Sequence, residues 1–179
     1  MGDNANRFYD RFVIWRKPIL PFVKLNSNGS VRNSNARAGG IIRDYQGVVL
    51  AAFASPLHPC SVLTTELYRL SYGIDICNKL GFVNVWIEVD AHLIIQILNN
   101  QGLVNHHNFY LLRKIKKSLS NINYTISHIF REDNACVDWL SNLGCHIDDY
   151  QDLNISNLDP ILKGMINLDK IALPYIRHV

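Results

Sequence analysis

The hydrophobic pattern of this chain changes its period near residue 60, and that change constrains the fold more than any other feature. Between Phe22 and Ala54, apolar residues alternate with polar ones or form short runs, as in half-buried strands. The apolar residues that follow recur at helical spacing, at Leu63, Leu67, Leu70, Ile74 and Cys77. The pattern therefore predicts three antiparallel strands followed by a long amphipathic helix. Thr64 or Thr65 is the expected cap of that helix, and Gly81 fits the position just after its end.

Shorter patterns extend this prediction along the chain. We expect strands over residues 22–28, 38–43, 48–54, 82–89 and 122–130, and further helices over residues 92–98, 109–119 and 134–143. The predicted element order is βββαβααβα, an α/β domain with a five-stranded mixed sheet. Residues 1–20 are expected to form a lead-in, 21–146 the domain, and 147–179 an extension that packs on it, with a short apolar pattern at 161–166 typical of a docking helix.

Composition sets broad limits on the class of protein. The 179 residues suit one domain, and 48% hydrophobic content agrees with a packed core. A net charge of +3 permits nucleic-acid contacts but also describes many ordinary proteins. The four cysteines show no metal or redox spacing, which favours free thiols. No leader-like or bilayer-spanning run is apparent, so we expect an intracellular protein, nuclear or cytoplasmic, without a membrane partner.

Three separated carboxylates fall at or near the ends of predicted elements. Glu66 lies near the start of the long helix, Asp90 ends a strand, and Asp138 lies in the last helix of the domain. Mg²⁺ prefers such oxygen ligands, and two-metal phosphodiester hydrolysis needs several of them in a small volume. Asn28, on the polar face of the first strand, would complete the set if it were an acid. Each residue also has a structural interpretation, such as helix capping by Asp90.

Five motifs in order carry a resemblance to a known family. They read VKLNSNGS, AGGIIRDYQG, TTELYRLSYGIDICNKLGF, WIEVDA and SHIFREDNACVDWLS. Together they resemble the ribonuclease H family, most closely the ribonuclease H-like domains of plant proteins related to retrotransposon reverse transcriptases. The resemblance spans about residues 15–177 and implies a ribonuclease H-like fold.

The resemblance also implies roles for individual residues. The family's catalytic, metal-binding carboxylates fall on Asn28, Glu66, Asp90 and Asp138, with an amide in the first place. His128 matches a histidine thought to assist product release or proton transfer. The implied metal is Mg²⁺ or Mn²⁺, with occupancy weakened by Asn28, and the implied substrate is the RNA strand of an RNA–DNA hybrid. Expected nucleic-acid contacts are Gly29, Ser30, Arg32 and Asn134.

Three interpretations of the missing charge stay open. The leading one is a ribonuclease H-like domain that binds nucleic acid but cleaves it poorly or not at all, because an amide forfeits the attraction between a carboxylate and a divalent ion. The alternative is a non-catalytic protein-interaction module on the same scaffold. The third is an active enzyme in which Asn28, water and the other carboxylates still hold metal. Two origins of Asn28 stay open: the protein is naturally a degenerate nuclease, or an investigator replaced an original aspartate at this position.

Overall fold

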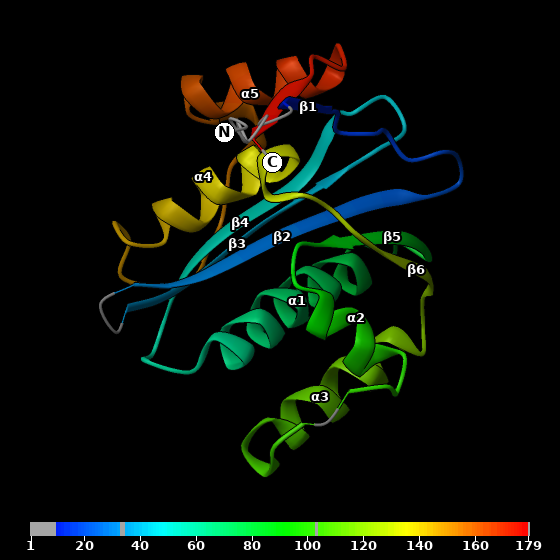
Figure 1. The fold of residues 1–179 in the computed structure, drawn as a ribbon, viewed down its shortest axis with the longest axis vertical. Coiled ribbons are helices and arrows are strands. Elements are labelled where there is room, and N and C mark those ends of the chain that lie inside the picture. Colours follow the sequence, from blue (N-terminus) through cyan, green and yellow to red (C-terminus); the bar gives the residue numbers. More distant parts are fainter. Residues whose placement is uncertain (1–9, 33–34, 103, 179) are drawn as a thin grey trace, which may run out of the picture.

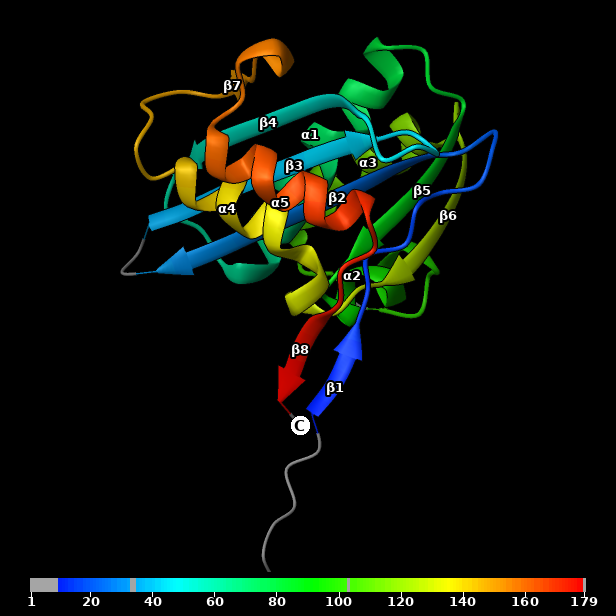
Figure 2. The same cartoon turned by 90° about the horizontal axis from the view of Figure 1, so that it is seen from above.

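The centre of the computed structural model, which describes residues 10–32, 35–102 and 104–178, is a mixed six-stranded sheet (Figure 1). The strand order across this sheet is β6-β5-β2-β3-β4-β7. Its strands are β2 (Val23–Arg32), β3 (Asn35–Arg43), β4 (Val49–Leu57), β5 (Asn84–Val89), β6 (Asn123–His128) and β7 (Gln151–Asp152). A separate two-stranded ribbon pairs β1 (Asp10–Val13) with β8 (Tyr175–His178), and Figure 2 shows it projecting from the body of the molecule.

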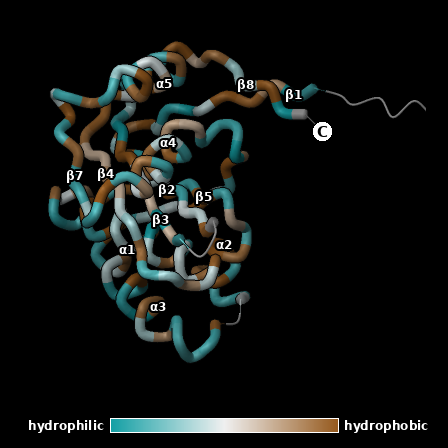
Figure 3. The backbone as a smooth tube through the Cα atoms, turned by 90° about the vertical axis from the view of Figure 1, so that its left-hand side faces the viewer, coloured by the Kyte–Doolittle hydropathy of each residue, from teal (hydrophilic) through white to brown (hydrophobic). Residues whose placement is uncertain are grey.

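Helices cover both faces of the sheet. Their bounds are α1 (Val62–Lys79), α2 (His92–Leu98), α3 (His106–Leu119), α4 (Ala135–Leu143) and α5 (Pro160–Lys170), with short 3₁₀ turns at Arg131–Asn134 and Ile155–Asn157. Helices α1 and α3 lie on one side of the strands, and α4 and α5 on the other (Figures 1 and 3). Among these helices, none is both long and apolar enough to cross a membrane.

The strand pairing confirms the predicted fold class. Strands β2, β3 and β4 are antiparallel neighbours, whereas β5 pairs in parallel with β2, and β6 in parallel with β5. The order βββαβααβα holds from β2 to α4. The sixth strand, β7, comes from the predicted extension and pairs with the edge of β4 at Phe53 and Ala54. The extension therefore completes the sheet as well as adding a helix.

Two predicted helix caps were wrong. Helix α1 is capped by Ser61, whose hydroxyl accepts from the Thr64 amide, so Glu66 lies beyond the first turn. Asp90 does not cap α2, because the N-cap is Ala91 and has no side-chain cap bond. The predicted end of α1 was right, since Gly81 follows the C-cap with a φ of 73°, a conformation that glycine adopts without strain.

The two faces of the sheet bury different cores. The larger apolar cluster lies between the sheet and helices α1 to α3, and it includes Leu25, Leu70, Ile87 and Ile115. The smaller cluster lies between β3, β4, α4 and α5. Because side chains alternate along β2, Leu25 faces the larger core and Asn28 faces α4. The register of β2 thus places Asn28 on the face that carries the last helix of the domain.

A buried polar network joins both ends of the chain to this second face. Arg43 of β3 contacts Asp169 of α5 at 2.5 Å, and the Tyr175 hydroxyl donates to the other Asp169 oxygen at 2.6 Å. The Trp15 indole donates to Asn26 Oδ1 at 3.0 Å and is only 1% exposed. Segments outside residues 21–146 are therefore integrated with the domain by charged and aromatic contacts.

Candidate functional site

The first predicted site residue, Asn28, pairs directly with the last one, Asp138. Asn28 lies in β2 and is 3% exposed, while Asp138 lies in the first turn of α4. The Asn28 Nδ2 amide donates to Asp138 Oδ1 at 3.0 Å. A carboxylate at position 28 would bring two negative oxygens together at this distance, a contact that a bound cation stabilises. The amide replaces that requirement with a hydrogen bond inside the protein.

The other two predicted acids share a cation that belongs to the chain itself. Arg69, one turn after Glu66 in α1, contacts Glu66 Oε2 through Nη2. The same nitrogen lies 3.0 Å from Asp90 Oδ1. Asp90 follows β5, so the guanidinium bridges a helix and the carboxyl end of a neighbouring strand. The structure therefore brings Glu66 and Asp90 together around Arg69.

Arg69 also links this pair to the strand that carries Asn28. Its Nη1 donates to the Ser27 carbonyl oxygen, and its side chain is 0% exposed. Burial lowers the pKa of Arg69 to about 10, with Asp90 acting in the opposite direction. The guanidinium consequently stays charged at neutral pH. Gly29 makes room for it, since a Cβ there would lie 2.8 Å from Thr65 Cγ2 and 3.2 Å from Arg69 Cδ.

Sequence reasoning missed Arg69, although the sequence holds a signal for it. Glu66 and Arg69 are spaced i, i+3 on α1, which places them side by side on the helix surface. The prediction of α1 depended on its apolar residues, and neither Glu66 nor Arg69 is one of them. The i, i+3 spacing of an arginine and an expected metal ligand is thus compatible with an ion pair within the helix, and the structure shows that pair.

As arranged, these residues do not fit a divalent ion. Glu66 and Asp90 face a guanidinium, and Asp138 accepts from an amide nitrogen, so their nearest counter-charges and donors come from the chain. In residues 10–32, 35–102 and 104–178, no group of three or more His, Cys, Asp or Glu side chains is placed to hold a metal. The four positions that the resemblance implies as metal ligands make contacts within the chain in this arrangement.

His128 lies at the end of β6, next to the strand end that carries Asp90. Its ring stacks on His92 of α2 with centroids 3.9 Å apart and planes 3° from parallel. Its strand runs beside β5, and its Cα partner Val89 directly precedes Asp90. Burial, followed by the neighbouring His92, lowers the pKa of His128 below its ordinary value. At neutral pH, His128 is therefore a neutral ring next to the carboxyl end of β5.

The residues expected to contact nucleic acid differ in their surroundings. Ser30 accepts from Arg37 Nε at 2.5 Å and is partly exposed, whereas Gly29 lies against α1. Asn134 is 3% exposed, and its Nδ2 donates to the Ser27 carbonyl at 3.4 Å. Asn134 thus faces the interior and holds the 3₁₀ turn to β2. The side chain of Arg32 lies outside the described residues.

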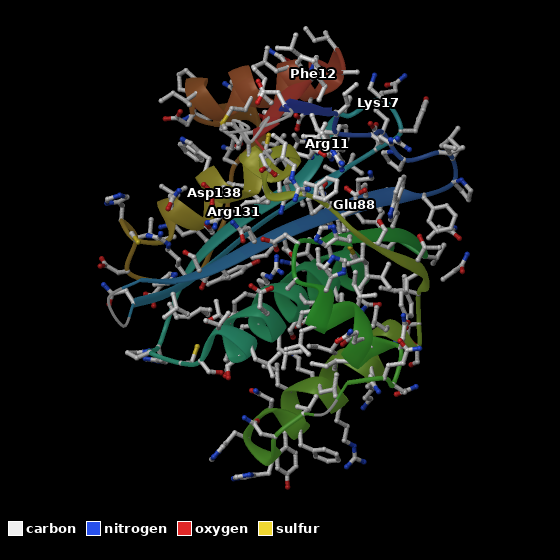
Figure 4. All side chains as sticks on the ribbon, in the orientation of Figure 1. Arg11, Phe12, Lys17, Glu88, Arg131 and Asp138 are labelled. Atoms are coloured by element: carbon white, nitrogen blue, oxygen red, sulfur yellow. The ribbon has the colours of Figure 1, made fainter. Side chains whose placement is uncertain are left out.

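An exposed cation, Arg131, borders the Asn28–Asp138 pair. Arg131 Nη2 lies 3.7 Å from Asp138 Oδ1, and the Arg131 side chain is 71% exposed. Figure 4 shows Arg131 beside Asp138 and Arg11 on the same side of the molecule. On α3, Lys114 pairs with Asp75 at 2.7 Å, so part of that basic face is neutralised. Arg131 is therefore an exposed cation in contact with Asp138.

Comparison with known proteins agrees with this fold. The model of the reverse transcriptase-like family matches residues 26–144. A protein of Arabidopsis thaliana that is provisionally named a ribonuclease H protein is 28% identical over 137 residues, which are 74% of this chain and 22% of that protein. The chain thus spans about a fifth of that relative's length.

Two solved structures illustrate the likeness of fold. The RNase H1 of the archaeon Halobacterium salinarum superposes with a TM-score of 0.65 at 18% identity, covering 70% of this chain and 98% of that one. LC11-RNase H1, solved in complex with an RNA/DNA hybrid, gives a TM-score of 0.63 at 21% identity, covering 68% and 94%. Since the family model spans most of the chain, including Asn28, Glu66, Asp90 and Asp138, this chain belongs to the reverse transcriptase-like family with a ribonuclease H-like fold.

Proposed function

We propose that this chain is a ribonuclease H-like domain that binds RNA–DNA hybrid or a related nucleic acid and hydrolyses it poorly or not at all. The named ribonuclease H relative and the hybrid complex of LC11-RNase H1 support the choice of ligand. The observation that carries the proposed loss of catalysis is the Arg69 guanidinium between Glu66 and Asp90. The hydrogen bond from Asn28 to Asp138 is a second contact that supports the proposed loss of catalysis.

The physical argument concerns charge in a small volume. Two-metal hydrolysis requires divalent ions that activate a water and stabilise the leaving oxygen. A fixed guanidinium at the carboxylates opposes a nearby divalent ion by repulsion and occupies oxygens that would bind it. Arg69 supplies one positive charge, and Asn28 removes one negative charge from the cluster. Both changes reduce the net negative charge that would attract a divalent ion, because Arg69 offsets one of the three remaining carboxylates and Asn28 supplies none.

Hydrolysis is tested by comparing four proteins with a labelled hybrid and Mg²⁺ in single-turnover reactions. The wild type, Asn28→Asp and Arg69→Ala are expected to show little or no cleavage. Each of these proteins keeps the Arg69 guanidinium, the Asn28 amide or both, and each feature opposes metal binding. The Asn28→Asp/Arg69→Ala double variant is expected to cleave measurably faster than either single variant. Cleavage by the wild type at ordinary enzyme rates would contradict the proposal.

Binding is tested separately by fluorescence anisotropy with the same hybrid in EDTA and low salt. We expect Arg131→Ala to weaken binding and to lower the slope of log affinity against log salt by roughly one, since one phosphate contact is lost. Lys163→Ala, on the exposed side of α5, is the matched control. Absence of detectable affinity at low salt would favour the protein-interaction alternative.

A further inference from the structure

A cavity lies away from Glu66, Asp90 and Asp138, between α1, the end of β4 with the loop that follows it, and the loop that precedes β7. Its volume is about 610 Å³, within the range of pockets that hold small ligands or side chains. Tyr68, Tyr72 and Tyr150 line it together with Pro59, and we call it the tyrosine cavity. Neither Arg69 nor Glu66 contributes to its walls.

The three tyrosine rings form adjoining walls at different angles. The Tyr68 and Tyr72 rings are 6.1 Å apart at 34°, and the Tyr72 and Tyr150 rings are 5.2 Å apart at 61°. Thr64, Tyr68 and Tyr72 are spaced by four residues, so they lie in one row along α1. That row is about 12 Å long at 1.5 Å per residue. The cavity is thus an elongated groove with aromatic faces.

The tyrosine cavity is lined by negative charge, whereas the net charge of the chain is positive. Asp148 and Asp149 line it and are both exposed, while its lining includes no lysine or arginine. Within the described residues, neither aspartate has a hydrogen bond or an ion pair. Nearby Asp152 is different, because it accepts from the Tyr150 hydroxyl at 2.6 Å. Two unpaired carboxylates therefore stand at a tyrosine-lined groove.

We propose that the tyrosine cavity binds the ammonium group of a lysine side chain carried by an extended basic peptide of a partner protein. Aromatic faces attract organic cations through their quadrupoles, and the two carboxylates add charge complementarity. The length of the tyrosine row matches about four residues of extended chain at roughly 3.3 Å each. Phosphate backbones are disfavoured by the same carboxylates, so this site is distinct from the proposed nucleic-acid surface.

The test is an NMR titration of the whole chain with an end-blocked peptide that contains one central lysine, and with the same peptide carrying acetyl-lysine. We expect saturable shifts confined to the groove with the lysine peptide. The acetyl-lysine peptide is expected to bind on the order of tenfold more weakly, because acetylation removes the charge. Tyr68→Leu is expected to weaken binding on the order of fivefold.

Controls separate recognition from folding. Tyr110→Leu removes an exposed tyrosine that lies outside the groove, on α3, and is expected to leave peptide affinity unchanged. Asp148→Asn/Asp149→Asn changes two exposed positions, so it tests the charge even if Tyr68→Leu fails to fold. Equal affinity for both peptides, no saturable shift, or full affinity in the Asp148→Asn/Asp149→Asn variant would overturn the proposal. Hybrid binding is expected to persist in all these variants.

Discussion

Arg69 Nη2 lies 3.0 Å from Asp90 Oδ1, and the same guanidinium contacts Glu66, so two acids expected to hold metal instead hold an arginine. Removing the cation leaves two poorly solvated carboxylates without a partner. We expect Arg69→Ala to lower the free energy of unfolding by about 3–5 kcal/mol, as for other broken buried ion pairs. Urea unfolding measures this loss. Arg113→Ala, on the exposed face of α3, is the control, and an equal loss in both variants would contradict this role.

Asn28→Asp tests the contact between Asn28 and Asp138. The variant replaces a donated hydrogen bond of 3.0 Å by two facing carboxylates. Their repulsion raises the folded-state pKa of the pair above its unfolded value, so stability is retained at low pH and lost as pH rises. We expect a lower melting temperature than wild type near pH 7 without divalent metal, and a smaller difference near pH 4. A higher melting temperature at pH 7 would contradict this geometry.

Asp133 gives a second pH-dependent prediction. Burial raises the pKa of Asp133 to about 6, and the carboxylates of Glu88, Glu132 and Asp169 act in the same direction while Lys24 opposes them. Its buried Oδ1 has no hydrogen-bond partner among the described residues. Because the folded pKa exceeds the unfolded one, ionised Asp133 lowers stability as pH rises toward 6.

Asp133→Asn should therefore raise the free energy of unfolding near pH 7. The gain should shrink below about pH 6 and vanish near pH 4, where the carboxyl is protonated in both states. Chemical unfolding of both proteins across this range measures the difference. A gain that does not change with pH would contradict the assigned cause.

The C-terminal extension is predicted to be part of the folding unit. The Tyr175 hydroxyl donates to Asp169 Oδ1 at 2.6 Å, and Asp169 is 2% exposed. We expect Tyr175→Phe to cost about 1.5–3 kcal/mol, as for hydrogen bonds to charged groups. Tyr45→Phe, at a 44% exposed position, is the matched control in the same unfolding experiment. If the two variants are equally stable, the extension is energetically separate from the domain.

The sequence predicted most of the fold because the elements from β2 to α4 have clear periodicity. The alternating residues of β2 correctly placed Asn28 on the face opposite Leu25, and the structure shows that α4 brings Asp138 to that same face. Strands β1, β7 and β8 were not predicted, because two to four residues are too few to show a period. Their positions depend on pairing with distant segments.

The site was less predictable than the fold because its chemistry depends on tertiary contacts. The motifs located Glu66 and Asp90, but the contact of both with Arg69 requires α1 and the end of β5 to meet. Capping of α2 by Asp90 was a reasonable local expectation that the Arg69 ion pair displaced. The tyrosine cavity likewise combines α1 with Tyr150, which is 78 positions after Tyr72 in the sequence. The Glu66–Arg69 spacing and the tyrosine row of α1 are local, but the contacts that Asp90 and Tyr150 add to them have no local signature.

The most direct test of the central claim is a titration of the wild-type protein and the Asn28→Asp/Arg69→Ala variant with Mn²⁺, followed by paramagnetic broadening of amide signals. If Arg69 and Asn28 prevent metal binding at these carboxylates, the wild type will show no selective broadening at Glu66, Asp90 and Asp138 at Mn²⁺ concentrations that broaden those signals in the double variant. Selective broadening of these three residues in the wild type, at the same concentrations, would contradict the account.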